Sequence, residues 1–295
     1  MTELSIYESG RTVSIPSSWD EMSPRQVRRV FRMYFDALRK GLSPLDLNVR
    51  ILYFLLGLKP SAGQLIIESV LPGVRERRAE NVYMLCEKCL GFLFTTSEDG
   101  SSVSLSFNTV RNPLPRTGCG LLGPADLLQD LTFGEFRHAA VALNDFFKSG
   151  NIEDLDECIT HLYRRGCRKS NRAGRNVPAV TQANIGLHKR RAARLPMWQK
   201  TLIMMWFSAC LKYLQEGQVV IDGEMVDMAA LFSGNADTDG LGYSWNDLLI
   251  EISKEQTLGN MDRVEEEPLF SILSIMWHNY KEGKRNEKIS KARKD

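Results

Sequence analysis

The chain has 295 residues, of which 43% are hydrophobic and 25% are charged, enough to build a sizeable core in one large domain or two smaller ones. Its formal net charge is only +2, so total charge gives no argument for a nucleic-acid partner. The first ten residues lack the segments of a secretory signal, and the longest apolar run, Leu202–Leu211, is about half as long as a membrane span. We therefore expect a cytoplasmic protein without a membrane partner, which keeps its six cysteines as free thiols.

The first element predicted along the chain is a β-hairpin over residues 1–16, because two short runs with strand character flank a polar turn. A helix follows it. Ser23 and Gln26 have the spacing of a capping box, in which each side chain accepts a hydrogen bond from a backbone N–H of the first turn. Apolar residues then recur at helical spacing as far as Leu38, and Gly41 is placed to end the helix.

Three further elements complete this part of the chain. Ser43 begins a second helix, with a proline in its first turn, and a third helix is predicted over residues 76–93. Apolar and serine residues alternate over residues 103–107, as in a strand. The preceding dipeptide Asp99-Gly100 favours a tight turn, so we predict a second hairpin here.

Proline and glycine are frequent in residues 111–124, which we interpret as a connector. The predicted organisation is an N-terminal hairpin and helical region, residues 1–115, followed by a C-terminal helical region, residues 116–295. The predicted fold class is mainly α, with one or more helical domains and two or three small β-hairpins.

The pattern of the first helix returns beyond the connector. Thr132 and Glu135 form a second capping box, similar apolar spacing follows, and Gly150 is placed to end the helix. Two interpretations remain open. Either a helical unit has been duplicated, or two capped amphipathic helices resemble each other because the same physical rules shape both.

The remaining predicted elements fill the rest of the C-terminal region. A short helix covers residues 151–165, and residues 166–187 have no apolar periodicity and form a loop. The strongly apolar residues 196–215 predict a core helix. Asp222-Gly223 is the turn of another hairpin, and a last helix begins near Pro268.

Two segments imitate ligand-binding motifs. Gly118–Gly123 matches the dinucleotide pattern G-x-G-x-x-G, but it follows a connector instead of a strand and Pro124 comes next, so we interpret it as a loop. Asn235–Gly240 imitates the start of a calcium loop. Because Asn246 stands where the bidentate Glu belongs, an exposed acidic turn is the better interpretation.

Cysteine spacing raises the question of zinc. Cys86 and Cys89 form one C-x-x-C pair, and Cys158 with His161 could supply two further ligands. The first pair lies within a predicted helix, where buried cysteine is the ordinary interpretation. None of the four histidines accompanies a nucleophile motif. We therefore predict a protein that is not an enzyme and needs no metal or other cofactor.

Charge is unevenly distributed in the C-terminal region. No Asp or Glu occurs from Cys158 through Gln215, whereas Arg and Lys are frequent there. The composition of residues 166–187 predicts an extended, mobile arm within residues 164–194, which we call the basic loop. Its candidate partner-binding residues are Arg164, Arg165, Arg168, Lys169, Arg172, Arg175, Lys189, Arg190, Arg191 and Arg194.

Three interpretations of the basic loop remain open. Its cations can dock on an acidic surface of a partner protein, they can bind the phosphate backbone of a nucleic acid, or the loop can simply be solvated. Aromatic residues, which would stack on bases, do not alternate with the cations, and this weakens the case for single-stranded nucleic acid.

One series of short motifs resembles a poorly characterised family that tailed phages and prophages encode near their tail genes. Gly123–Leu128 resembles the family's GP-x-D-x-L motif, Leu131–Phe136 resembles LT-x-GEF, and Leu162–Arg164 resembles LYR, which a basic loop follows. The resemblance is good over residues 111–215 and looser elsewhere. Family members often have proline after LYR, where this chain has Arg165.

The resemblance implies a role in tail morphogenesis, as an assembly chaperone or a minor structural component. Its partners would be phage tail or other assembly proteins, in the host cytoplasm or in the virion. The motifs contain caps and turns, so they indicate a family without specifying a chemistry. The alternative function is a nucleic-acid-binding accessory protein that uses the basic loop.

Overall fold

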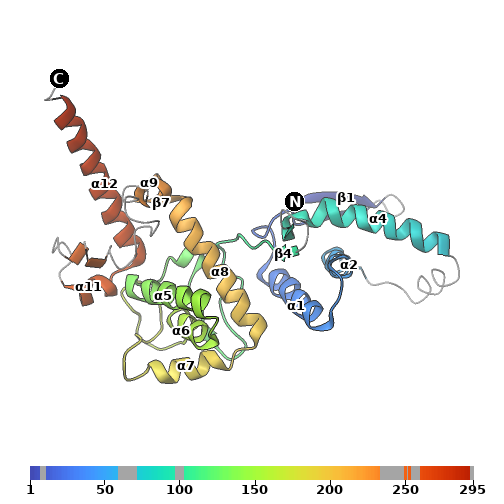
Figure 1. The fold of residues 1–295 in the computed structure, drawn as a ribbon, viewed down its shortest axis with the longest axis horizontal. Coiled ribbons are helices and arrows are strands. Elements are labelled where there is room, and N and C mark those ends of the chain that lie inside the picture. Colours follow the sequence, from blue (N-terminus) through green and yellow to red (C-terminus); the bar gives the residue numbers. More distant parts are fainter. Residues whose placement is uncertain are drawn as a thin grey trace. The chain divides into compact units, whose positions relative to one another are not determined.

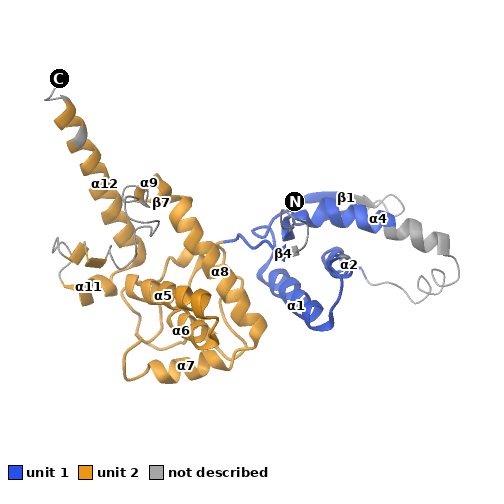
Figure 2. Cartoon of the chain, in the orientation of Figure 1, with its two compact units in different colours: residues 1–109 blue, residues 110–295 orange. Residues whose placement is uncertain are grey.

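The computed structural model describes residues 1–6, 11–58, 72–96, 103–232, 249–250, 252–253 and 260–292 (Figure 1). The chain forms two compact units, Met1–Thr109 and Val110–Asp295 (Figure 2). The sequence placed this division near residue 115. In the structure Val110 already belongs to the second unit, because its carbonyl accepts a hydrogen bond of 3.1 Å from Trp206 Nε1.

The first unit combines helices with two antiparallel strand pairs, β1 with β2 and β3 with β4. Its helices are α1 (Pro24–Lys40), α2 (Pro44–Leu56), α4 (Pro72–Leu90) and the 3-10 helix η1 (Gly91–Leu93). Its strands are β1 (Thr2–Ile6), β2 (Arg11–Ile15), β3 (Phe94–Thr96) and β4 (Val103–Leu105).

Aromatic side chains form the centre of the first unit. The rings of Trp19 and Phe107 lie 4.8 Å apart, and Phe31 meets Phe107 edge to face at 5.9 Å. Trp19 and Phe31 are almost completely buried, and Trp19 Nε1 donates a hydrogen bond to the Ser106 carbonyl. The segment before α1 is thereby attached to the segment after β4.

The second unit is built mainly from helices. They are η2 (Asp126–Leu128), α5 (Phe133–Ser149), α6 (Ile152–Leu162), α7 (Ile185–Ala193), α8 (Met197–Glu216), α9 (Met228–Phe232), α11 (Met261–Glu266) and α12 (Leu269–Ala292). Its strands are β5 (Leu121–Leu122), β6 (Arg164–Arg165), β7 (Gln218–Ile221) and β8 (Glu224–Asp227), paired as β5 with β6 and β7 with β8.

The core of the second unit lies between α5, α6 and α8 (Figure 1). Helix α6 packs against α5, and α7 and α8 pack against α6. The predicted core helix is α8, whose buried apolar residues are Leu202, Ile203, Trp206, Phe207, Cys210 and Leu214. Within the described part of the chain, no helix combines the length and the apolarity that a membrane span requires.

The predicted mainly helical fold with small hairpins is confirmed. Both capping boxes are present, and Gly41 and Gly150 end their helices in the left-handed conformation, with φ values of 62° and 68°. The structure favours neither of the two interpretations of the repeated helix pattern, duplication or independent resemblance. The pairing of β5 with β6 was not predicted, because it joins segments that are distant in the sequence.

Three predicted features lie outside the described residues. They are the turn of the first hairpin, the Asp99-Gly100 turn and the loop Asn235–Gly240 that imitates a calcium site.

Candidate functional site

A buried ionic cluster occupies the start of α5. Glu135 is the third helical residue of α5, where its carboxylate accepts a hydrogen bond of 3.3 Å from the Thr132 backbone N–H. The same carboxylate accepts hydrogen bonds from Arg164 Nη2 and from Asn171 Nδ2. The side chain of Arg164 is completely buried and that of Glu135 is 9% exposed, so this ion pair is shielded from water.

Arg175 completes the cluster from the middle of the basic loop. Its Nη2 donates hydrogen bonds to the carbonyls of Leu122 and Leu162, and its Nη1 lies 4.0 Å from Glu135 Oε2. Leu162 is the last residue of α6, so its carbonyl is at the negative end of that helix dipole. Burial lowers the pKa of Arg175 to about 10, which still leaves the guanidinium charged at neutral pH.

The expectation of an extended arm that presents all ten cations is therefore wrong for Arg164 and Arg175. Both side chains are buried and hold the basic loop against α5 and α6. Two more candidates are neutralised on the surface. Arg172 Nη1 lies 2.5 Å from Glu267 Oε1, and Lys189 Nζ lies 3.2 Å from Glu157 Oε2.

Six of the predicted partner-binding residues have no ion-pair partner within the part of the chain that the structure describes. Arg191 is half-buried, and the others are exposed. They lie in the loop that follows Arg164 and on or next to α7. These residues are Arg165, Arg168, Lys169, Arg190, Arg191 and Arg194.

A second group of buried polar contacts accounts for the presence of Gly123, Pro124 and Tyr163 in the motifs that resemble the phage family. Asn112 Nδ2 donates a hydrogen bond of 2.6 Å to the Pro124 carbonyl, and its Oδ1 accepts one of 3.0 Å from the Tyr163 hydroxyl. A Cβ atom at Gly123 would lie 2.5 Å from the Tyr163 ring, so only glycine fits there. These motif residues hold the connector against the end of α6, which is an architectural role.

His161 on α6 and Lys200 on α8 lie buried nearby, and His138 on α5 lies beside them with its side chain 45% exposed. Lys200 Nζ lies 2.5 Å from Asp156 Oδ1, and both side chains are less than a tenth exposed. The rings of His138 and His161 stack with their centroids 5.1 Å apart. Burial, together with the positive charges of neighbouring side chains, lowers the pKa of His161 to about 3, so its ring stays neutral.

The cysteines considered as zinc ligands are buried in helices. Cys86 and Cys89 lie on α4, and Cys158 and His161 lie on α6 in the other unit. Burial raises the pKa of Cys86 to about 11 and also raises the pKa of Cys158. Among the described residues, no three His, Cys, Asp or Glu side chains are grouped closely enough to hold a metal ion.

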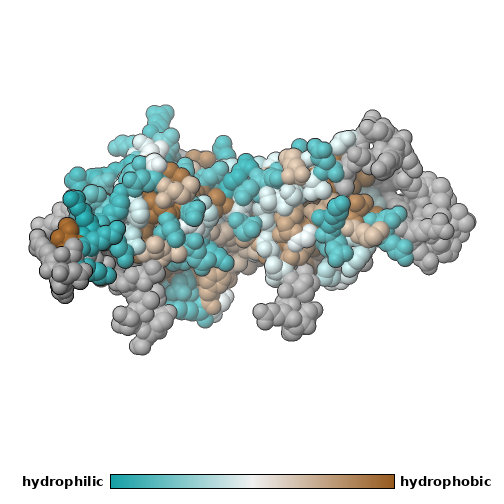
Figure 3. Space-filling model, turned by 90° about the horizontal axis from the view of Figure 1, so that it is seen from above, coloured by the Kyte–Doolittle hydropathy of each residue, from teal (hydrophilic) through white to brown (hydrophobic). Residues whose placement is uncertain are grey.

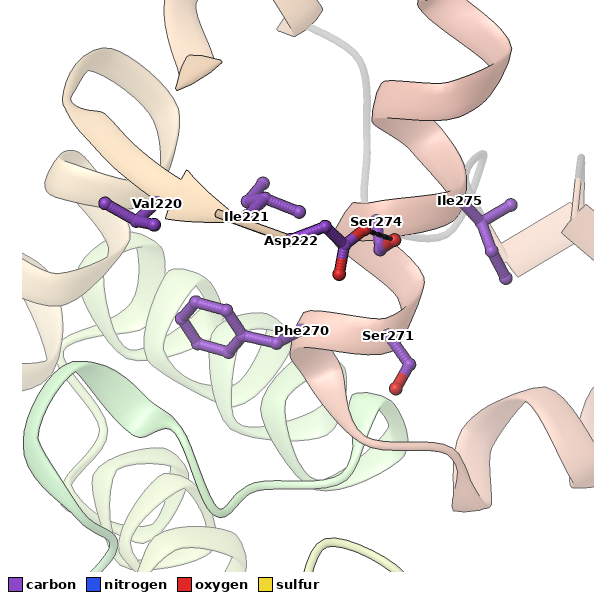
Figure 4. Close-up of a pocket in the computed structure, with 7 residues that line it drawn as sticks. All are labelled: Val220, Ile221, Asp222, Phe270, Ser271, Ser274 and Ile275. Atoms are coloured by element: carbon purple, nitrogen blue, oxygen red, sulfur yellow. Dashed lines mark hydrogen bonds between the residues drawn. The ribbon is translucent and has the colours of Figure 1, made fainter. Parts of the chain in front are cut away.

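A hollow of about 340 Å³ lies on the surface of the second unit, between the β7–β8 hairpin and the start of α12 (Figure 4). The end of β7 and the following turn supply one side, and the first two turns of α12 supply the other. Its lining residues are Val220, Ile221, Asp222, Phe270, Ser271, Ser274 and Ile275.

The hairpin beside this hollow exposes an apolar pair. Val220 and Met225 are direct partners across the two strands, and their side chains are 57% and 64% exposed. The opposite face of the same hairpin is buried through Val219, Ile221 and Val226. The outer face therefore carries one apolar pair beside the polar pair Gln218 and Asp227, and the described residues leave this face exposed to solvent.

Polar contacts hold the hairpin to α12. The Ser274 hydroxyl donates to the Asp222 carboxylate, which lies in the turn (Figure 4). Trp277 Nε1 and Lys281 Nζ both donate to Glu224 Oε2, at 2.7 and 2.8 Å. These hydrogen bonds lower the pKa of Glu224, so it remains ionised. Asp222 and Gly223 have φ values of 51° and 81°, as a type I′ turn requires.

This surface was not predicted from the sequence. The alternation that predicts a hairpin leaves open which face the rest of the fold covers, and α12 comes about fifty residues later in the chain. A signal was available in Val219-Val220-Ile221, because a two-stranded hairpin with apolar residues on both faces exposes those of one face unless a second element covers them.

Comparison of the chain with protein-family models, with curated proteins and with solved structures finds no match.

Proposed function

We propose that this protein acts without enzymatic activity in the assembly of a phage or prophage tail, by binding a partner protein as a chaperone or minor structural component. The phage context rests on the resemblance of the motifs over residues 111–215. The contacts of Asn112, Gly123 and Glu135 give those motifs a role in holding the fold. Because these motif residues serve the fold, we assign partner binding to residues on the surface of the protein.

The observation that carries the proposal is the exposed pair Val220 and Met225 beside the hollow. Apolar side chains that gather on a surface next to a concave site are typical of protein-binding sites. Phe270 and Ile275 offer apolar walls for a partner side chain, and the Ser271 hydroxyl at the rim is exposed for hydrogen bonding. Figure 3 shows hydrophobic residues gathered in several areas among hydrophilic ones on the drawn face of the protein.

A second candidate function, nucleic-acid binding through the basic loop, has its own observation. Six of its cations have no ion-pair partner among the described residues. Four of the ten predicted residues serve internal or surface ion pairs instead: Arg164, Arg172, Arg175 and Lys189. This division reduces the charge that the basic loop offers to phosphates, so we rank protein binding first.

The test uses the tagged full chain, expressed together with the genes that surround it, and identifies the captured proteins by mass spectrometry. The variant Val220→Ser/Met225→Ser removes the apolar pair. The control Leu187→Ser removes an apolar side chain that is 53% exposed on α7, in the same unit.

We expect the wild type and the control to capture the same assembly protein, and the double variant to lose at least about tenfold in capture, because hot-spot truncations cost about 2 kcal/mol or more. Equal capture by all three chains would remove the hairpin surface from the proposal. Capture of nucleic acid alone, lost on nuclease treatment and in the variant Arg165→Gln/Arg168→Gln/Lys169→Gln, would favour the second candidate.

A further inference from the structure

Helix α12 has two parts with different environments. Its first turns are packed into the second unit, where Leu269, Ile272 and Leu273 are completely buried. From Lys281 to Ala292 every side chain that the structure describes is exposed. Figure 1 shows this part of α12 extending beyond the other labelled elements of its unit. A helical segment whose described side chains are all exposed is thus presented to solvent.

The cations of this segment lie on one face. At 100° per residue their positions fall within about 120° of the helix circumference, and the two acidic positions, Glu282 and Glu287, fall outside that arc. We call this face the basic stripe of α12. It consists of Lys281, Lys284, Arg285, Lys288 and Lys291.

The stripe is anchored at the end nearest the body. Lys281 Nζ lies 2.8 Å from Glu224 Oε2 on the hairpin, and Lys284 Nζ lies 5.6 Å from the centre of the Tyr280 ring. Arg285, Lys288 and Lys291 have no ion-pair partner among the described residues. Three cations therefore project from a helix whose base is held in place by polar contacts.

We propose that the basic stripe of α12 binds the phosphate backbone of duplex DNA. The stripe spans about 15 Å, because each helical residue rises 1.5 Å, and a duplex carries one phosphate charge per about 1.7 Å of its axis. A straight row of cations on a rod about 10 Å wide matches a regular row of phosphates, and a rod of this width fits the major groove.

The composition of the same segment disfavours other anionic partners. Interfaces between proteins have an apolar centre, and residues 281–292 offer only Ile289 and Ala292. A helix that lies on a membrane needs an apolar face opposite its cations, and Gly283, Asn286 and Ser290 occupy that region here.

Single-stranded nucleic acid is disfavoured as well. The aromatic rings nearest the stripe already have partners: Trp277 stacks on Tyr280 at 5.6 Å and donates a hydrogen bond to Glu224. They are therefore poor platforms for bases.

The experiment measures binding of the full chain to a short labelled DNA duplex by fluorescence anisotropy over a range of salt concentrations. The stripe variant is Arg285→Gln/Lys288→Gln/Lys291→Gln, which keeps helix-forming residues at exposed positions. The control, Arg25→Gln/Arg29→Gln/Arg32→Gln, removes the same charge from exposed positions of α1, to which no binding role is assigned. Circular dichroism establishes that each variant is folded.

We expect the wild type and the control to bind alike, with affinity that falls steeply as salt rises. The stripe variant should bind at least about tenfold more weakly, and its slope of log affinity against log salt should be smaller by roughly 2 to 3, since each phosphate contact contributes about 0.9. Unchanged binding by the stripe variant would overturn the proposal, as would a loss confined to the control. Binding of the wild type to anionic lipid vesicles or to an acidic protein, but not to the duplex, would also overturn it.

Discussion

Arg164 donates a hydrogen bond to Glu135 in the interior of the second unit, so the residue at the start of the basic loop is internal. Removing one partner of such a pair leaves the other charge buried without compensation. We expect Arg164→Met to lower the free energy of unfolding by about 3 to 5 kcal/mol. Arg165→Met, at the exposed neighbouring position, should change it by less than about 0.5 kcal/mol.

Urea denaturation followed by circular dichroism measures both variants. If Arg164→Met is as mild as Arg165→Met, the side chain of Arg164 is not buried against Glu135 in solution.

Sequence patterns predicted those features of the fold that depend on contacts between residues close together in the chain. The caps at Ser23 and Thr132 are local, because each involves a residue only three positions further on. The Arg164–Glu135 pair joins residues 29 positions apart. A run of cations is ordinarily solvated, so the charge pattern alone predicted that Arg164 and Arg175 are exposed. Both are buried instead, because hydrogen-bond acceptors distant in the sequence bind their guanidinium groups inside the unit.

The candidate site was harder to predict than the fold. The Asp222-Gly223 turn identified the β7–β8 hairpin, because this dipeptide favours positive φ at both positions. Exposure of Val220 depends on where α12 packs, which no local pattern determines. The apolar run Val219-Val220-Ile221 could signal such a surface, but which of its residues is exposed became visible only in three dimensions.

Gly123 lies against the Tyr163 ring, which makes this position sensitive to a single methyl group. A Cβ atom there would lie 2.5 Å from Tyr163 and 2.8 Å from Asn112 Nδ2. We expect Gly123→Ala to destabilise the protein by about 1 to 3 kcal/mol, as overpacking does. Gly118→Ala is the matched control from the same connector, because a Cβ atom at Gly118 meets nothing within 4 Å.

Thermal unfolding distinguishes the two alanine variants. Equal melting temperatures would contradict the close packing of Tyr163 on the connector.

Buried His161 makes stability depend on pH. Its folded pKa is about 3, mainly because burial disfavours the charged ring, whereas an unfolded histidine titrates near 6.5. Between these values the unfolded chain binds a proton that the folded chain does not. The contribution to stability is therefore complete above about pH 6.5 and is lost as pH falls toward 3, by up to about 1.4 kcal/mol per unit.

The measurement is the free energy of unfolding from pH 7 to pH 4.5. His161→Phe, which keeps an aromatic ring beside His138, should flatten this dependence. His278→Gln, at a side chain that is 70% exposed, should leave the dependence as in the wild type. An unchanged slope in His161→Phe would show that other groups produce the pH dependence.

The six cysteines divide by exposure, and this division predicts their reactivity. Cys119 and Cys167 are exposed, whereas the remaining four are buried. Burial also raises the pKa of each of these four, which lowers the fraction of reactive thiolate. The four buried cysteines are Cys86, Cys89, Cys158 and Cys210.

We therefore expect a disulfide reagent to modify two thiols of the native protein quickly, and the other four only as the chain unfolds. The variant Cys119→Ser/Cys167→Ser should lose the fast phase while keeping four thiols that react in denaturant. Because the first unit contains Cys86 and Cys89 and the second contains Cys158 and Cys210, the slow phases also report on each unit separately. A fast phase that persists in the double variant would mean that one of the four buried thiols reaches solvent in the native protein.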